Sequence, residues 1–192
     1  MFRIMDFNPL YTETYFIKTR RTRISALKPK KIGCNIMEFC DNIRTIIEES
    51  CEDYFLGKAD LSLPDQIVTE QYASLIAIYP RAISIGITLP QNITKEKLLN
   101  GNLNYNEFNR KINKITNNLC DLLDCGGYKA LAVPKSGNIR DEIFSSLHYM
   151  AAFNANLGRI EKNMFITPEV GVGVNWGTVL TDAPLDVICP GL

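Results

Sequence analysis

A stripe of apolar residues between positions 105 and 123 constrains the fold more than any other feature of this sequence. Its members recur at steps of three and four residues, the spacing that places side chains on one face of an α-helix. They are Tyr105, Phe108, Ile112, Ile115, Leu119, Leu122 and Leu123. Gly126 and Gly127 follow, and glycine adopts the left-handed conformation that ends many helices. The pattern predicts a long amphipathic helix with one buried face.

Two further segments show helical spacing. Apolar residues recur at steps of three and four from Ile36 to Phe55, and Gly57 follows as a stop. Another helix is expected from about Asp141 to Leu157, because acidic residues occupy its first turn, where the helix dipole favours them.

Short segments with strand character separate and follow these helices. Residues 82–89 alternate, are rich in isoleucine and lie between two prolines, which predicts a buried strand. Residues 128–134 are predicted to form a shorter strand. Residues 164–167 and 174–181 are predicted as two strands joined by the sequence PEVGVG, with a hairpin as one arrangement.

The order of these elements bears on the fold class. Alternating helices and strands suit a parallel doubly wound sheet. However, no strand is followed by G-x-G-x-x-G, and the last two strands are joined too tightly for a crossover. We therefore expect an α+β fold with a mixed or largely antiparallel sheet flanked by helices.

The charge distribution suggests a division of the chain. The 192 residues carry 21 basic and 21 acidic side chains, but residues 1–31 hold eight basic residues and only Asp6 and Glu13 as acidic ones. We expect a basic arm over residues 1–34 and one domain over 35–192. No run of apolar residues is long enough for a membrane span or resembles a secretory signal, so a cytoplasmic protein without a membrane partner is expected.

The six cysteines contain no C-x-x-C pair, and several fall at apolar helical positions. This distribution favours reduced thiols in the core over a disulfide framework. One histidine and scattered cysteines do not give the spacing of a zinc site, so no metal ligands are assigned.

The segment 157–185 reads LGRIEKNMFITPEVGVGVNWGTVLTDAPL. It resembles the epoxyqueuosine reductase family, in which a helix ending Ala-Gly-Leu-Gly is followed by Ile-Gly-Lys-Asn, a strand, a Pro-Glu-x-Gly turn and a strand ending Thr-Asp-x-Pro-Leu. Weaker similarity extends over residues 36–188. The resemblance implies a sandwich like those of nitroreductase-type flavin enzymes and corrinoid chaperones, with cobalamin bound above the sheet.

The same resemblance implies where a site would lie. Asp141 and Glu142 are the nearest match to the family's catalytic proton donor. The predicted cofactor-binding residues offer small polar groups or a backbone open to a wide flat ring. They are His148, Asn163, Thr167, Gly171, Gly173, Asn175, Gly177, Thr178 and Thr181. A purely structural role for these glycines, threonines and the lone histidine is the alternative.

The sequence also departs from the family. Glu161 and Asn156 stand where the family has glycine, and the chain ends at Leu192 without the cysteines of the family's iron–sulfur clusters. We therefore expect a corrinoid-binding module with no iron–sulfur cluster, which takes electrons from a separate ferredoxin-like donor. The alternatives are a non-catalytic binding or assembly protein, such as a homodimer, and a flavin-binding relative. Contact of the basic arm with tRNA phosphates is less favoured than a solvated or partner-docking arm.

Overall fold

The computed structural model describes residues 36–63, 70–90, 103–135, 142–162 and 164–192. All of them belong to one compact unit, Ile32–Leu192. The elements in chain order are α1 (Ile36–Glu48), β1 (Tyr54–Asp60), the 3₁₀ turn η2 (Glu70–Tyr72), α2 (Ala73–Ile78), β2 (Arg81–Thr88), α4 (Leu103–Cys125), β3 (Ala130–Ala132), α5 (Glu142–Asn154), β4 (Arg159–Glu161), β5 (Met164–Ile166), β6 (Val174–Thr181) and α6 (Leu185–Ile188). The predicted basic arm and its boundary lie outside the described residues.

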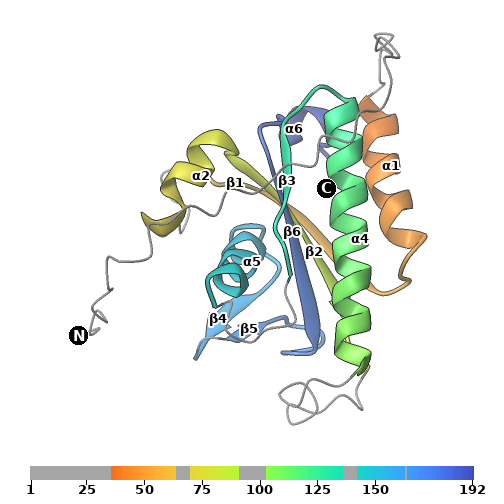
Figure 1. The fold of residues 1–192 in the computed structure, drawn as a ribbon, viewed down its shortest axis with the longest axis vertical. Helices are drawn as coiled ribbons and strands as arrows, with labels where there is room; N and C mark the ends of the chain where they lie inside the picture. The colour runs from red at the N-terminus through yellow and green to blue at the C-terminus, as the bar shows by residue number, and fades with distance from the viewer. Residues whose placement is uncertain (1–35, 64–69, 91–102, 136–141, 163) are drawn as a thin grey trace. The chain divides into compact units, whose positions relative to one another are not determined.

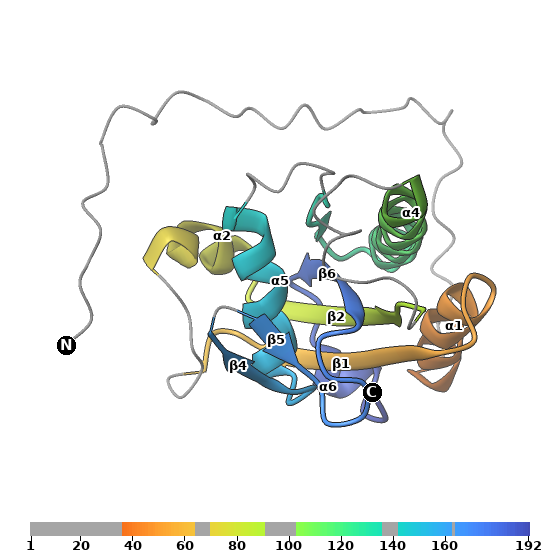
Figure 2. The same cartoon turned by 90° about the horizontal axis from the view of Figure 1, so that it is seen from below.

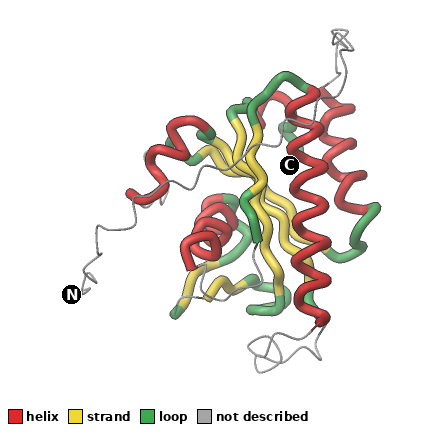
Figure 3. Tube along the Cα trace, viewed as in Figure 1, coloured by secondary structure: helices red, strands yellow, loops and turns green. Residues whose placement is uncertain are grey.

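The main sheet has the strand order β1-β2-β6-β3, and every neighbouring pair is antiparallel. β2 and β6 form its centre, and all eight residues of β6 are buried. Helices lie on both sides of the strands (Figures 1 and 3). The α+β fold with a largely antiparallel sheet is thus confirmed.

The two faces of this sheet contact different helices. Ile83, Ile85 and Ile87 of β2 pack in one apolar cluster with residues of α1 and α4. Ala82, from the alternate set, packs in a second cluster with Leu147 of α5. Because side chains in a strand alternate between faces, β2 presents one set to α1 and α4 and the other to α5. Figure 1 shows α4 and α5 on opposite sides of the strands.

The C-terminal half contains a second, small sheet. β5 pairs antiparallel with β4 and not with β6, so the suggested hairpin between residues 164–167 and 174–181 is wrong. β4 was not expected, because its three residues are all exposed and show no apolar alternation. Figure 2 shows the β4–β5 pair beside α5.

The long helix is confirmed as α4, and Gly127 after it has φ 84°. The helix predicted for Ile36–Phe55 is too long, since α1 ends at Glu48 and Tyr54 begins β1. Tyr54 and Phe55 fit the helical spacing, but pairing with β2 places them in the sheet. Gly57 therefore lies within a strand rather than ending a helix.

α5 covers most of the helix predicted for Asp141–Leu157, and the predicted strands at 82–89 and 128–134 correspond to β2 and β3. α2 and η2 were not predicted. Their 3₁₀ turn and single six-residue helix are too short to show a clear helical period.

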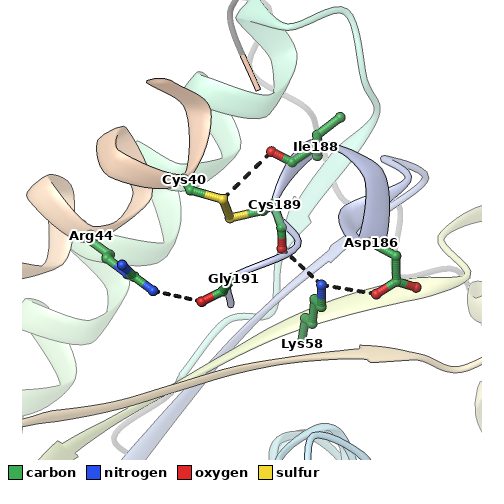
Figure 4. The surroundings of a disulfide bond; sticks show 7 residues. All are labelled: Cys40, Arg44, Lys58, Asp186, Ile188, Cys189 and Gly191. Carbon is green, nitrogen blue, oxygen red and sulfur yellow. Dashed lines mark hydrogen bonds and ion pairs between the residues drawn. A yellow bond between two sulfur atoms is a disulfide. The ribbon is translucent and has the colours of Figure 1, made fainter. Parts of the chain in front are cut away.

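The expectation that the cysteines are reduced is wrong for one pair. Cys40 of α1 and Cys189, directly after α6, form a disulfide across 149 residues of sequence (Figure 4). Arg44 donates to the Gly191 carbonyl at 2.7 Å, and Lys58 donates to the Cys189 carbonyl at 2.9 Å. The C-terminal residues are thus attached to α1 and β1.

The other cysteines that the structure describes carry free thiols. Cys120 is buried, and burial raises its thiol pKa to about 12. Cys125 is exposed, so its free thiol lies outside the core. As for membranes, none of the helices in the described ranges combines the length and the apolar character that a membrane crossing requires.

Candidate functional site

The predicted cofactor-binding residues on β6 do not face one site. Thr178 lies on the side of the sheet that contacts α5, where it meets His148. Asn175, Gly177 and Thr181 belong to the alternate set of β6, which faces α4. The sheet itself therefore separates the two groups.

The residues on the α4 side have structural partners. Asn175 Nδ2 donates to Asn109 Oδ1 of α4 at 3.1 Å. A Cβ on Gly177 would lie 2.6 Å from a methyl carbon of Ile112, so this glycine allows α4 to approach the sheet. Thr181 Oγ1 donates to the Lys129 carbonyl at 2.8 Å. None of these three is placed to touch a ligand at the surface.

Thr167, Gly171 and Gly173 lie together in the connection from β5 to β6, the glycine turn (residues 167–173). Thr167 is buried and its Oγ1 donates to the Gly171 carbonyl at 3.1 Å, which shapes the turn. Gly171 has φ 64° and open space where a Cβ would be. Val170 and Val172 are 40% and 45% exposed. The glycine turn thus presents apolar side chains and accessible backbone to solvent.

His148 and Thr178 belong to a buried group that we call the polar layer: Ser84, Lys135, His148 and Thr178. His148 Nδ1 lies 3.0 Å from Thr178 Oγ1, and Ser84 is the cross-strand partner of Thr178. Within the described residues, the hydroxyl of Ser84 is buried and has no hydrogen-bond partner. Unpaired buried polar atoms are rare, and they indicate either a cost in stability or a use.

Lys135 enters the polar layer from the edge of the sheet. Its Nζ donates to the Trp176 carbonyl at 2.8 Å. Asn113 of α4 holds the backbone of Lys135 through two hydrogen bonds, one to its carbonyl at 3.1 Å and one from its N–H at 3.2 Å. The amine is buried, although the residue as a whole is partly exposed.

Burial dominates the electrostatics of the polar layer. It lowers the pKa of the Lys135 amine to about 7. It also holds the pKa of His148 well below its ordinary value, and the charge of Lys135 acts in the same direction, while the Pro134 carbonyl opposes it. His148 is therefore neutral at physiological pH, and a large fraction of Lys135 is unprotonated.

The remaining predicted residues cannot be placed. Asp141 and Asn163 lie outside the described residues. Glu142 begins α5, but its side chain is outside the described part as well. The predicted catalytic pair thus stays a prediction.

The sequence pattern did not identify Lys135, which directly follows the strand predicted over 128–134, or Ser84, which lies within the strand predicted over 82–89. Ser84 did carry a signal, because it is a hydroxyl inside a run of isoleucines predicted to be buried. Lys135 carried none, since its burial depends on α4 and β6 meeting at the edge of the sheet.

A cleft of about 200 Å³ lies elsewhere, and Lys58, Asp60, Arg81 and Asp186 are among its lining residues. Two ion pairs neutralise these charges, Lys58 with Asp186 at 3.0 Å and Arg81 with Asp60 at 3.2 Å. Sites for cofactor-sized molecules usually measure roughly 300–1,000 Å³. This cleft is therefore a poor candidate for a large cofactor.

Comparison with known proteins adds no assignment: no family model and no curated protein matches the chain. Among the described residues, no group of three or more His, Cys, Asp or Glu side chains is arranged to hold a metal ion.

A corrinoid requires an apolar floor and a backbone that its wide ring can approach. The glycine turn fits both requirements through Val170, Val172 and the open position of Gly171. The buried predicted residues do not fit as direct contacts, because His148, Asn175, Thr178 and Thr181 are each at most 2% exposed. Fewer of the described residues can therefore contact a corrinoid ring than the sequence suggested.

Proposed function

We propose that this chain is a cytoplasmic, corrinoid-binding module of an epoxyqueuosine-reductase-like protein, and that the glycine turn contacts the ring. A bound corrinoid would supply cobalt-centred reduction chemistry, with electrons from a separate ferredoxin-like donor. The residues of this chain would bind and orient the ring, with Val170 and Val172 beneath it and the backbone of Gly171 and Gly173 at its rim.

The observation that carries the proposal is the exposure of the glycine turn within the segment of family resemblance. Val170 and Val172, with Ile160 of β4, are three of the six exposed large hydrophobic residues in the described part, and all three fall within 157–185. Exposed apolar groups gathered in one segment favour a binding surface over a solvated one.

The backbone around this segment supports the resemblance. Asn156 stands where the family has glycine, and its φ of 57° lies in the left-handed region that Gly and Asn adopt most readily. A Cβ on Gly158 would lie 2.3 Å from the Ile166 carbonyl oxygen, so the next glycine of the pattern is required by the close approach of β5. The backbone of this chain thus constrains both positions, which supports the proposal.

One feature opposes a cytoplasmic location. Structural disulfides are rare in the cytosol of most organisms, and Cys40 and Cys189 form one. Both cysteines are at most 9% exposed, so burial would have to shield the bond from cellular thiols.

The test is titration of the purified full chain with hydroxocobalamin under reducing conditions. Binding should change the corrinoid absorption spectrum towards the base-off form and should raise the melting temperature of the protein. Val172→Glu should weaken binding at least about tenfold, a loss of roughly 1.4 kcal/mol, because it places a charge in the apolar floor. Val187→Glu is the matched control, since Val187 is 60% exposed on α6, outside the glycine turn.

Absence of any spectral change with hydroxocobalamin would refute the proposal. Binding that Val172→Glu and Val187→Glu leave equally strong would refute the glycine turn as the contact surface. Parallel titration with flavin mononucleotide separates the flavin-binding alternative. A concentration-dependent mass without ligand binding would favour the assembly alternative instead.

A further inference from the structure

The disulfide between Cys40 and Cys189 joins α1 to the residue that directly follows α6. In the cytoplasm, where the proposed function places this chain, permanent disulfides are rare. The cysteine pairs that do form there usually open and close with the thiol balance of the cell. The bond is therefore either a permanent link that burial shields or a reversible one, and the structure around it distinguishes the two.

The segment that the disulfide holds has little stability of its own. α6 is a single turn of four residues, and no side chain caps its N-terminus; helices this short are not stable in isolation. Lys58 pairs with Asp186 at 3.0 Å, and Arg44 donates to the Gly191 carbonyl at 2.7 Å (Figure 4). The Asp186 carboxylate and the Arg44 bond are exposed to solvent, where such links contribute little. Besides the buried apolar side chains of α6, the disulfide is thus the main link of this segment to α1.

Positive charges flank both cysteines. Arg44 lies one helical turn after Cys40 on α1, and Lys58 Nζ donates to the carbonyl of Cys189 itself at 2.9 Å. Nearby cations favour the thiolate, which is the form that attacks and leaves in thiol–disulfide exchange. Cys120 is the opposite case, because burial and two aspartates of α4 raise the pKa of its thiol to about 12. The cysteine pair thus has the surroundings of an exchangeable bond, and Cys120 does not.

The bond is buried, but only by a thin covering. Cys189 is fully buried and Cys40 is 9% exposed. The neighbours of Cys189 along the chain include Val187, Pro190 and Gly191, which are all exposed. Unwinding the one turn of α6 is therefore enough to bring the sulfur atoms to solvent. Local openings of this kind need much less free energy than unfolding of the whole domain.

We propose that Cys40 and Cys189 form a reversible thiol switch, in which reduction releases α6 from α1. A thiolate of a cellular dithiol attacks one sulfur atom, the S–S bond breaks, and the other cysteine leaves as a thiolate. The second thiol of the reductant then displaces the first cysteine from the mixed disulfide. The two cysteines gain two electrons and two protons, and the reductant becomes a disulfide.

The switch would act on the cleft of about 200 Å³, because Leu185 and Asp186 of α6 line it together with Lys58 and Arg81 of the sheet. Release of α6 removes one wall of this cleft. It also takes from Lys58 both of its partners in the C-terminal segment, the Asp186 carboxylate and the Cys189 carbonyl. Reduction thus changes both the shape and the charge of the cleft. The inference takes only the cytoplasmic location from the proposed function and does not depend on corrinoid binding.

The first experiment measures access to the bond in the full native chain. The protein is treated with dithiothreitol and then with N-ethylmaleimide, and peptide mass spectrometry follows each cysteine. Reduced Cys40 and Cys189 should be alkylated at least about tenfold faster than Cys120, the internal control, because thiolate character and exposure set the rate. A bond that dithiothreitol opens only in denaturant would overturn the proposal, since it would then be a shielded, permanent link.

The second experiment measures hydrogen exchange of backbone amides in the oxidised and the reduced protein. Reduction should speed exchange in residues 183–192 at least about tenfold, while α4 and β6 keep their protection. A double variant, Cys40→Ser with Cys189→Ser, should exchange like the reduced protein and should not respond to dithiothreitol. Cys125→Ser is the matched control and should respond like the unchanged chain, because Cys125 is an exposed free thiol.

Two outcomes of the exchange experiment would contradict the switch. Equal exchange of residues 183–192 in both states would show that the bond does not hold α6. Loss of protection throughout α4 and β6 would show that the bond supports the whole fold rather than one segment. The hydroxocobalamin titration reports on the corrinoid site separately, so failure of either proposal leaves the other standing.

Discussion

The two faces of the central sheet differ although the same strands build both. The face towards α1 and α4 contains a large apolar cluster that includes Ile83, Ile85 and Val179, with the buried Asn175–Asn109 pair beside it. The face towards α5 also contains apolar residues, but the polar layer interrupts them. Ile83 and Ser84 are neighbours in β2 and both are fully buried. One residue of sequence thus separates a side with the larger apolar cluster from a side that holds a buried lysine and a buried histidine.

The largest expected effect concerns the disulfide, which belongs to the apolar side through α1. A bond closing a loop of 149 residues stabilises the folded state by about 5 kcal/mol in the chain-entropy model. Cys189→Ala should therefore lower the free energy of unfolding in urea, and dithiothreitol should do the same to the unchanged protein. Cys125→Ser, at an exposed free thiol, should have little effect. If dithiothreitol leaves the unfolding midpoint in place, the bond does not contribute to stability in solution.

The next effect compares the two faces directly. Ile83→Ala should lower the free energy of unfolding by about 2–5 kcal/mol, because it leaves a cavity among fully buried residues. Ser84→Ala should change it by less than about 1 kcal/mol or should stabilise, because the Ser84 hydroxyl has no partner to lose. Urea denaturation of both variants measures the difference. Similar losses at the two positions would contradict the contrast between the faces.

The pH dependence of stability should come from the α5 side. The pKa of Lys135 is about 7 in the folded protein and about 10.5 when unfolded, so the unfolded chain binds more protons between these values. Stability should then rise with pH across this window by up to about 1.4 kcal/mol per unit, and Lys135 should contribute no pH slope below it. Lys135→Met should remove the slope. Urea titrations at pH 7, 8 and 9 measure how the free energy of unfolding changes with pH. An equal change in the Lys135→Met variant would exclude Lys135 as the source of the pH dependence.

The smallest effect concerns the hydrogen bond between His148 and Thr178. Thr178→Val should lower the free energy of unfolding by about 1–3 kcal/mol, because it leaves Nδ1 of His148 buried without its partner. Thr178→Ser keeps the hydroxyl and should retain most of the stability. If valine is tolerated as well as serine, the hydrogen bond contributes nothing measurable.

Local patterns in the sequence were sufficient for the elements that have a strong period. The stripe ending at Leu123 and the isoleucine-rich run around Ile85 each repeat often enough to identify α4 and β2. The same reasoning failed at Tyr54, where a helical spacing continued by chance into a strand. It also failed for β4, whose three exposed residues gain their strand conformation from pairing with β5.

The candidate site was only partly predictable for a related reason. Gly171 and Gly173 lie in the turn that the sequence indicated, and Gly171 has open space where a Cβ would be, because turn chemistry is local. Gly177 has the same chemistry, but it faces Ile112 in the core. Spacing alone cannot tell which side of a strand will be covered by which helix.

The sequence by itself determined that the chain forms an α+β fold, since the helical and strand periods and the tight connections are encoded in neighbouring residues. Only the tertiary structure decided which residues meet. It joined Cys40 to Cys189, divided the predicted site between two faces of a sheet, and buried Lys135 beside His148. These outcomes depend on contacts between distant segments, and the free energy of burying a thiol, an amine or an imidazole depends on those neighbours rather than on the residue itself.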